Sequence, residues 1–252
     1  MDSDAEDQIE TFIAARGLRP SWPEIANGLR PQTIAAGYRL QNAIHHRIGG
    51  RVGYKVGSTS AAGQRVFGLQ EPVYAGLFAA DRSADLGQAL ARPYRSPSLE
   101  CEIAFVISRD LDAAYLPKTG VASAIGACHI ACEIIDNRYG DPAAVGVPSL
   151  IADDFFQAGF VLGPPNPDWR HQDLNRVRAS MTINGQRFEG SASDVLDAYA
   201  SLTWLVKKRG HLAAGEIVLT GAIVGPVSIA LPANDVELAV TGFVPMAFPM
   251  AS

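Results

Sequence analysis

From Arg51 onward the sequence is divided into short segments rich in β-branched residues, and this division most limits the folds open to the chain. The segments read RVGYKVG, PVYAGLF, CEIAFVI, AGFVLG, VRASMTING, GEIVLTG, PVSIAL and DVELAV, and Gly, Pro or Asp bounds them. Runs of this length with such boundaries predict strands. Within MTINGQRFEG, Asn184-Gly185 predicts a two-residue hairpin turn. We expect a β-rich body over residues 51–252.

The residues before this body are patterned as helices. Residues 4–16 and 31–48 carry apolar side chains at helical spacing, which predicts a helical segment over 1–50. Two more helices are predicted inside the body, at about Val121–Ala131 and at about Ala192–Arg209, the second capped by Ser193 and ended by Gly210. We expect an α+β fold in which residues 1–252 form a single domain.

Composition and charge narrow the classes of function. A net charge of −5 without a Lys/Arg-rich tract argues against nucleic-acid binding, so we expect a small-molecule partner. Glycines and prolines interrupt the most apolar run, Ile217–Ala233, which predicts strands rather than a membrane helix. The acidic start, MDSDAEDQIE, is unlike a signal peptide, and three cysteines are an odd number. We therefore expect reduced thiols in the cytoplasm.

The segment CHIAC places Cys128, His129 and Cys132 close together on the helix predicted near Val121–Ala131. Two interpretations stay open, a metal clip and a packed helix with small side chains. Structural zinc sites usually have paired cysteine motifs and a fourth ligand. We therefore favour packing.

The stretch SPSLECEIAFVISRDLD, residues 96–112, predicts an apolar strand that contains Glu100 and Glu102. Alternation places Leu99, Cys101, Ile103 and Phe105 on one face and both glutamates on the other. With a rise of about 3.3 Å per residue, the two carboxylates start roughly 6.6 Å apart. They are close enough to repel each other or to bind one cation.

A third carboxylate follows in HIACEIIDNRYG, where Glu133 and Asp136 are expected at a junction between a helix and a strand. Three carboxylates without clustered His or paired Cys suit Mg²⁺ or Mn²⁺ better than zinc. The alternative is that Glu100 and Glu102 only line a solvated strand face.

Lys55 stands out in RVGYKVGSTS because it lies between Gly53 and Gly57 on the same face of the predicted strand. Glycines at these positions permit another group to approach the backbone closely. The alternative is an ordinary surface lysine. As a site residue, Lys55 would hold a substrate carboxylate or stabilise an enolate; nearby carboxylates would disfavour the neutral amine that Schiff-base chemistry needs.

Other acids are weaker candidates. Asp136, Asp153, Asp154 and Tyr139 are possible participants in a site. Loop acids beside Pro or Gly usually cap turns, and we favour that role for Asp141 and Asp153. The sequence contains no GxSxG, no P-loop and no GxGxxG after a predicted strand.

The order of several motifs resembles a known enzyme group. YKVGSTSAAGQRVFGLQEPVYAGLF is followed by LECEIAFVI, ACEIIDNRY, SLIADDFFQAGFVLG and GEIVLTGAIVGP. Together they resemble the 2-keto-4-pentenoate hydratase and 4-oxalocrotonate decarboxylase group of the fumarylacetoacetate hydrolase superfamily. The similarity extends from about Tyr38 to about Val240.

This resemblance implies a mixed β-roll of the fumarylacetoacetase C-terminal type, with an N-terminal helical segment and surrounding helices. It implies Mg²⁺ or Mn²⁺ bound at Glu100, Glu102 and Glu133 and a catalytic Lys55 that also binds substrate. It implies that Ser60, Thr220 and Gly221 approach the substrate. A homo-oligomer is expected, or association with a related subunit.

Three departures from the group's pattern bear on the reaction. Pro72-Val73-Tyr74 lacks the acidic residue of PDF, Ser58 replaces the leucine of KVGLTS, and Asp153-Asp154-Phe155-Phe156 stands where ADN precedes small residues. A candidate acid/base is thus missing. We expect a hydratase acting on a 2-hydroxydienoate or 2-oxo-enoate; the alternatives are a 2-oxo acid decarboxylase and a non-catalytic partner or binder. The C-terminal VPMAFPMAS packs on a neighbour or on its own core.

Overall fold

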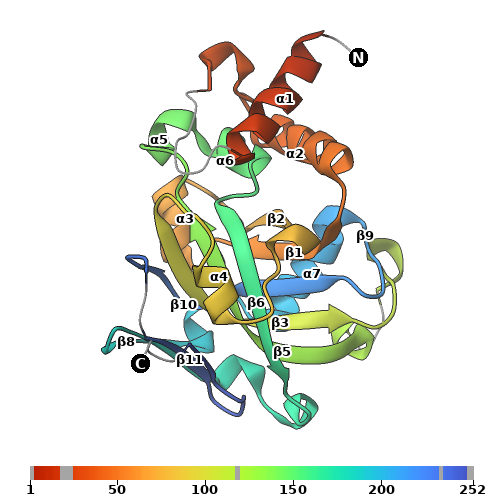
Figure 1. The fold of residues 1–252 in the computed structure, drawn as a ribbon. Coiled ribbons are helices and arrows are strands. Elements are labelled where there is room, and N and C mark those ends of the chain that lie inside the picture. The colour runs from red at the N-terminus through yellow and green to blue at the C-terminus, as the bar shows by residue number, and fades with distance from the viewer. Residues whose placement is uncertain (1–2, 18–24, 117–119, 233–234, 249–252) are drawn as a thin grey trace.

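The computed structural model describes residues 3–17, 25–116, 120–232 and 235–248 (Figure 1). Its α-helices are α1 Ser3–Gly17, α2 Ile34–Ile48, α3 Ala61–Phe67, α4 Leu86–Leu90, α5 Pro142–Val145, α6 Val147–Ala152 and α7 Ala198–Arg209. Its strands are β1 Arg51–Gly57, β2 Val73–Phe78, β3 Pro97–Ile107, β4 Leu111–Asp112, β5 Ile125–Asp136, β6 Gln157–Pro165, β7 Arg178–Ile183, β8 Gln186–Ser191, β9 His211–Leu212, β10 Ile217–Ser228, β11 Val236–Val240 and β12 Met246–Phe248.

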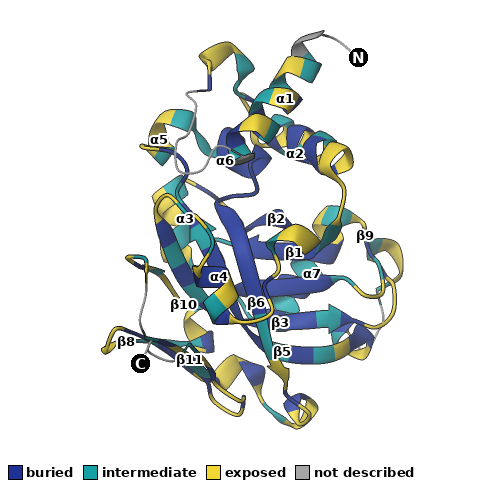
Figure 2. Cartoon of the chain, viewed as in Figure 1, coloured by how far each residue is buried: buried dark blue, intermediate teal, exposed yellow. Residues whose placement is uncertain are grey.

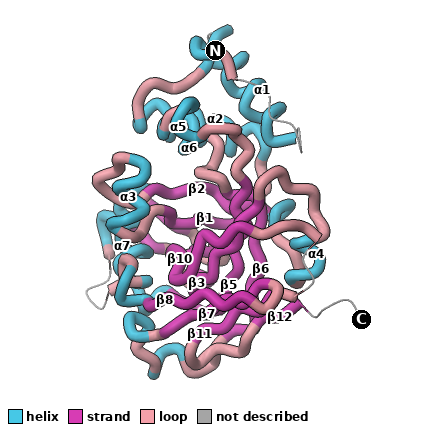
Figure 3. Tube along the Cα trace, turned by 90° about the vertical axis from the view of Figure 1, so that its left-hand side faces the viewer, coloured by secondary structure: helices cyan, strands magenta, loops and turns pink. Residues whose placement is uncertain are grey.

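A six-stranded sheet in the order β2-β1-β10-β3-β5-β6 forms the centre of the molecule (Figure 3). β1 and β10 are parallel, and the other neighbours are antiparallel. The sheet curls so far that the segment after β2 reaches the opposite edge strand, β6. There the Ser83 amide donates to the Phe160 carbonyl at 3.0 Å. The curl gives the sheet an outer and an inner face.

The two faces of the curled sheet bury different cores. The outer face packs on α7 and on a four-stranded sheet, β12-β11-β7-β8, over the largest apolar cluster. Figure 2 shows this central region as buried. The inner face holds a smaller apolar cluster made of Leu77, Ala104, Ala131, Phe160, Ile217 and Leu219. The inner face is therefore apolar at one end, next to the positions that carry the glutamates.

The N-terminal helices cover one end of the curled sheet (Figure 1). The helices predicted over 4–16 and 31–48 are confirmed as α1 and α2, and Thr33 caps α2 by accepting from the Ala36 amide at 3.1 Å. α2 lies against α6 so closely that a Cβ on Gly37 would be 2.4 Å from the Pro148 carbonyl oxygen. Their apolar side chains join those of β2 and of Phe155 and Phe156 in one cluster.

The prediction of a helix near Val121–Ala131 is wrong. Val121–Ala124 is a short 3-10 turn, and Ile125–Asp136 is strand β5. The small residues Gly126, Ala127 and Ala131 weaken the strand pattern, but β5 is paired on both sides, and Cys128, Ile130, Cys132 and Ile134 alternate into the outer core. The clip at CHIAC is also wrong, because alternation points His129 to the opposite face from both cysteines. The three cysteines are buried free thiols.

Other predictions differ in detail. The last helix begins at Ala198, and its cap is Asp197 instead of Ser193, since residues 192–194 form a separate 3-10 turn; Gly210 ends it as expected. Most of GEIVLTG and the first half of PVSIAL lie in one irregular strand, β10. The Asn184-Gly185 hairpin between β7 and β8 is confirmed, with both residues at positive φ. Residues 246–248 pair with β11 of their own chain. No helix in the described part of the chain is long and apolar enough to cross a membrane.

Candidate metal centre

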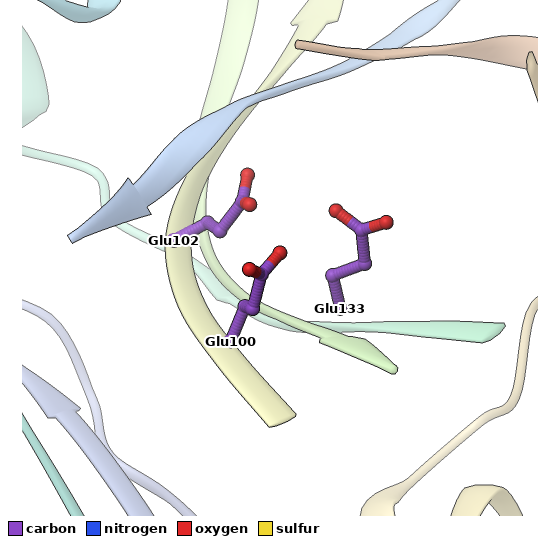
Figure 4. Close-up of side chains that lie close together, drawn as sticks. All are labelled: Glu100, Glu102 and Glu133. Atoms are coloured by element: carbon purple, nitrogen blue, oxygen red, sulfur yellow. The ribbon is translucent and has the colours of Figure 1, made fainter. Parts of the chain in front are cut away.

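Three glutamates meet on the inner face of the curled sheet (Figure 4). Glu100 and Glu102 lie on β3, and Glu133 lies on β5 directly opposite Glu100 in the strand register. Each side chain offers one carboxylate oxygen, and these three oxygens lie within 4.8 Å of one another. The structure therefore brings together the three side chains that the sequence singles out, although β5 was predicted to be partly helical.

Two of the three carboxylates are out of contact with water. Glu102 is 1% exposed and Glu133 is 0% exposed, whereas Glu100 is half-buried and faces a cavity. The Gly221 amide donates to Glu102 Oε2 at 2.9 Å. Glu133 Oε1 lies 3.1 Å from the Lys55 ammonium nitrogen, and within the described structure Glu133 Oε2 has no hydrogen-bond donor. Buried acceptors without donors are costly, so this arrangement is short of positive charge.

The pKa values of all three carboxyl groups are raised, which is consistent with too little positive charge around them. Burial, followed by the charge of Glu133, raises the pKa of Glu100 to about 7, although Lys55 opposes the shift. Burial and the other two carboxylates raise the pKa of Glu102 well above its ordinary value. Burial also raises the pKa of Glu133. A cation between the carboxylates would favour their charged forms and so lower these raised pKa values.

The residues present fit a divalent metal ion. Carboxylate oxygens are the ligands that Mg²⁺ and Mn²⁺ prefer, and oxygens of three carboxylates converge here, one of the carboxylates with a buried oxygen that lacks a donor. The neighbouring thiols of Cys101 and Cys132 belong to the outer core on the opposite face of the same strands. The donor set is therefore oxygen alone, which suits a hard cation better than zinc.

Lys55 lies beside these carboxylates and is 2% exposed. Its Nζ is 3.1 Å from Glu133 Oε1 and donates to the Phe155 carbonyl at 2.9 Å. Burial lowers the pKa of Lys55, but Glu133 and Glu100 raise it by more, so the pKa lies above its ordinary value. Lys55 is thus a charged ammonium, which argues against the Schiff-base alternative.

The two glycines beside Lys55 have different consequences. A Cβ on Gly53 would be 1.9 Å from the Ile217 carbonyl oxygen, so Gly53 allows β10 to lie directly against β1. A Cβ on Gly57 would be 3.4 Å from the Phe155 ring and 3.6 Å from Lys55 Nζ. Gly57 therefore leaves the space into which the ammonium and the aromatic ring extend.

A cavity of about 160 Å³ opens next to Lys55 and Glu100. One part of its wall is polar and includes the segment 58–60, while the other part is apolar. The apolar part consists of Phe67, Ile135, Phe155 and Phe156. Among the described residues of the wall, Lys55 is the one cation. We call the part of the wall with Lys55 and Glu100 the charged end and the part with these apolar side chains the apolar end; the two meet where the Phe155 ring centre lies 5.6 Å from Lys55 Nζ.

Of the remaining predicted substrate residues, Ser60 lines this cavity, whereas Thr220 and Gly221 do not. The Ser60 hydroxyl also caps α3 by accepting from the Gly63 amide at 3.0 Å. Gly221 contributes the amide that Glu102 accepts. The Thr220 hydroxyl donates to the Ile103 carbonyl at 2.9 Å, and Thr220 lines a different, smaller pocket. The structure does not bring the Thr220 hydroxyl to the carboxylates.

The residues that depart from the family pattern lie in or near the wall of the cavity. Val73 stands where the family has an acidic residue, and it is buried among the apolar side chains around Phe155. No carboxyl group is therefore present at this position. Ser58 lines the cavity, as do both phenylalanines. The Phe155-Phe156 pair therefore narrows the cavity and fills part of the core at once.

The other acidic candidates have structural partners. The Asp136 carboxylate accepts from the Arg95 and Ser96 amides, and Asp141 caps α5 as expected. Asp153 is more than a turn residue, because its buried carboxylate binds Arg16, Arg138 and the Tyr139 hydroxyl. These partners are distant in sequence, so no local spacing could have revealed them.

Comparison with known proteins agrees with the fold and with the motifs. The fumarylacetoacetate (FAA) hydrolase C-terminal family matches residues 62–250. A 4-oxalocrotonate decarboxylase from Pseudomonas sp. is 28% identical and covers 87% of this chain and 86% of its own; a 2-keto-4-pentenoate hydratase from Paraburkholderia phymatum is 36% identical and covers 69% and 68%.

The solved structure of 4-oxalocrotonate decarboxylase from Pseudomonas putida G7, complexed with magnesium and adipate, shares the fold. It aligns with a TM-score of 0.82 at 22% identity, over 100% of this chain and 98% of that one. The roll predicted from the sequence is thereby confirmed. The chain belongs to the fumarylacetoacetate hydrolase C-terminal family.

Proposed function

We propose that the protein is a divalent-metal-dependent hydratase, a lyase that adds water to a small 2-hydroxy-2,4-dienoate or its 2-oxo-4-enoate tautomer during aromatic-compound catabolism. The observation that carries this proposal is the division of the cavity. The buried Lys55 and Glu100, one of the three clustered glutamates, line its charged part, and apolar side chains line the rest. The named hydratase and decarboxylase relatives support the same chemistry.

The charged end suits the 2-oxo acid part of such a substrate. Glu100, Glu102 and Glu133 would hold Mg²⁺ or Mn²⁺, which when bound supplies Lewis-acid stabilisation of the negative charge that forms on the 2-oxygen. The Lys55 ammonium binds the substrate carboxylate or the enolate oxygen by charge. Because the Phe155 carbonyl already fixes Nζ, Lys55 needs little reorganisation to do so.

The apolar end favours hydration over decarboxylation. A hydroxydienoate has an uncharged hydrocarbon tail, which Phe67, Phe155 and Phe156 can contact. A 4-oxalocrotonate-like acid has a second carboxylate, and among the described wall residues the first carboxylate already uses the one cation. Burying an unpaired carboxylate against phenyl rings is costly.

A decarboxylase is the second candidate. The observation that favours it is the similarity to the Pseudomonas decarboxylase, which extends over 87% of this chain. The same metal and lysine would accept the electrons released with CO₂, so the two reactions differ mainly at the far end of the substrate.

An ultraviolet assay tests the proposal. Purified protein with Mg²⁺ or Mn²⁺ receives freshly generated 2-hydroxypenta-2,4-dienoate, and 4-oxalocrotonate is tested in parallel for CO₂ release. Metal-dependent loss of dienoate absorbance without CO₂ supports the hydratase. CO₂ release from the second acid instead supports the decarboxylase, and metal binding without turnover of either indicates a non-catalytic oxo-acid binder.

Three further parts of the proposal rest on the sequence. Residues 1–252 form one domain, the protein assembles as a homo-oligomer or with a related subunit, and it resides in the cytoplasm. Light scattering of the purified chain, alone and mixed with a related subunit, tests the assembly.

A further inference from the structure

The turn between α6 and β6 has an unusual backbone. Asp154, Phe155 and Phe156 have φ angles of 57°, 45° and 69°, although none of them is glycine. Side chains with a Cβ adopt this left-handed region rarely, and three in succession form a strained turn. Such a turn persists only where its surroundings hold it.

Two buried carboxylates hold this turn to the rest of the protein. Asp153 Oδ2 accepts from Arg138 Nη2 at 2.6 Å and from the Tyr139 hydroxyl at 3.0 Å, and Asp153 Oδ1 accepts from Arg16 Nε at 3.0 Å. Asp153 is 0% exposed and Arg138 is 4% exposed. Charge-assisted hydrogen bonds of this kind are strong where water is excluded.

Asp154 is bound from three different elements. Its Oδ2 lies 2.7 Å from Arg16 Nη2 on α1, and its Oδ1 lies 2.7 Å from His45 Nε2 on α2. The Gly76 amide on β2 donates to Oδ1 at 2.8 Å. The two N-terminal helices and an edge strand thus meet at one carboxylate.

The far side of the same turn forms part of the cavity. The Phe155 carbonyl accepts the hydrogen bond from Lys55 Nζ, and the Phe155 and Phe156 rings line the apolar end. The Phe155 ring centre is 5.6 Å from Lys55 Nζ. Arg16 and His45 do not line this cavity, so they reach it only through the turn.

We propose that Asp154, held by Arg16 and His45, is a positioning residue that fixes the left-handed turn and thereby orients the Lys55 ammonium and the two phenyl rings. The inference concerns the site of the proposed function and rests on that function only for its effect on turnover. It assigns a role to α1 and α2, which contribute no side chain to the wall of the cavity.

The experiment measures Lys55 directly as well as turnover. Acetic anhydride labels exposed amines, and peptide mass spectrometry gives the rate at Lys55 in the folded protein. Arg16→Gln and Asp154→Ala are compared with Asp154→Asn, whose amide oxygen can still accept from the Gly76 amide and whose side chain tolerates a left-handed φ. Mn²⁺ affinity and kcat with the dienoate are measured on the same samples.

Arg47→Gln is the matched control. Arg47 on α2 pairs with Glu6 and Glu10 on α1, so its loss loosens the same two helices without touching the turn. A merely structural role for α1 would make Arg16→Gln and Arg47→Gln alike.

The proposal expects severalfold faster labelling of Lys55 in Arg16→Gln and Asp154→Ala and a kcat lower by about tenfold or more, with Mn²⁺ affinity unchanged. Arg47→Gln should stay close to wild type, and Asp154→Asn, which keeps the Gly76 hydrogen bond but loses the charge, should lie between wild type and Asp154→Ala. Labelling of Lys55 at the wild-type rate in the folded Arg16→Gln and Asp154→Ala proteins would overturn it.

Two complications still leave a decision. If Arg16→Gln does not fold, the contrast between Asp154→Ala and Asp154→Asn decides, and equal labelling in that pair refutes the proposal. If the wild type does not turn over the dienoate, the proposed function fails, while the labelling rates still test the positioning of Lys55.

Discussion

The three glutamates show how strongly a few residues define this molecule. Burying three carboxylates near one ammonium opposes folding, because each must leave water and each repels the others. Glu100 and Glu102 were placed on one face by strand alternation alone, and the structure agrees. Glu133 was identified in a segment predicted as a helical junction; it joins them because β5 pairs in register with β3. Residue type drew attention to Glu133 and Asp136, and the family resemblance selected Glu133 where local structure prediction did not.

Glu102→Gln tests the metal role of the cluster. The variant keeps the shape of the side chain and an oxygen for the Gly221 amide, but it removes one charge. We expect the metal-free variant to melt no lower than wild type. We also expect it to lose the stabilisation by Mg²⁺, which for a site at a hundred times its Kd is about 2.7 kcal/mol. Thermal unfolding with and without Mg²⁺ measures both, with exposed Glu237→Gln as control. An undiminished Mg²⁺ effect would remove Glu102 from the site.

Lys55→Met tests the charged end of the cavity. Methionine fills a similar volume without the ammonium, so the substrate charge loses its partner and turnover should fall by about 100-fold or more. Mn²⁺ should bind at least as tightly as to wild type, because a positive charge 3.1 Å from Glu133 is gone. Initial rates and Mn²⁺ titration by electron paramagnetic resonance measure the two effects. Exposed Lys208→Met is the control, and a wild-type rate in Lys55→Met would exclude Lys55 from the mechanism.

At the scale of single elements, β1 and β5 illustrate opposite outcomes of sequence analysis. The alternation of glycine with Lys55 in β1 correctly predicted a close approach, which is that of the Ile217 carbonyl. In β5, small residues such as Gly126 and Ala127 carry no strand propensity, and pairing with β3 and β6 makes the segment a strand. Local propensity is weak where both neighbours are strands from distant parts of the chain.

Substitutions in β1 should separate stability from substrate binding. In Gly53→Ala the new Cβ would press on the Ile217 carbonyl at 1.9 Å, and we expect a loss of about 3 kcal/mol in unfolding free energy. In Gly57→Ala the nearest atoms are at 3.4 Å, so the loss should be below about 1 kcal/mol. The Gly57→Ala methyl enters the cavity and should raise KM. Urea unfolding and steady-state kinetics check the pair; equal stability losses would contradict it.

At the scale of the whole molecule, the N-terminal helices and the curled sheet are joined through buried charges. Both helices were predicted from apolar spacing, but their role was not. Arg16 and His45 are ordinary residues on those helices, and only the fold shows that they meet at Asp154. Pairing between distant charges leaves no periodic trace in a sequence, so this connection could not have been predicted.

The connection predicts a dependence of stability on pH. Burial raises the pKa of Asp154, but His45 and Arg16 lower it by more, so it lies below its ordinary range; Asp153, Arg138 and Tyr139 face the same cluster. A depressed pKa contributes stability above the unfolded value of about 3.9, and this stability is lost as the pH falls toward the folded value. Asp154→Asn should be less stable by about 1.5–3 kcal/mol at neutral pH.

This difference should shrink as the pH is lowered from 5 through 4 and below. Urea unfolding of wild type and Asp154→Asn at each pH measures it. A difference that stays constant, or that grows on acidification, would show that the charge of Asp154 is not what stabilises the turn.

The position of β10 has a consequence for how the protein is made. β10 lies between β1 and β3, yet it begins only at Ile217, so the strand that joins Lys55 to the glutamates leaves the ribosome long after its two neighbours. Until then the nascent chain carries two strands whose facing edges await a partner. The three glutamates and Lys55 meet only after this strand has been synthesised, so the growing polypeptide cannot assemble the candidate site until the strand is inserted.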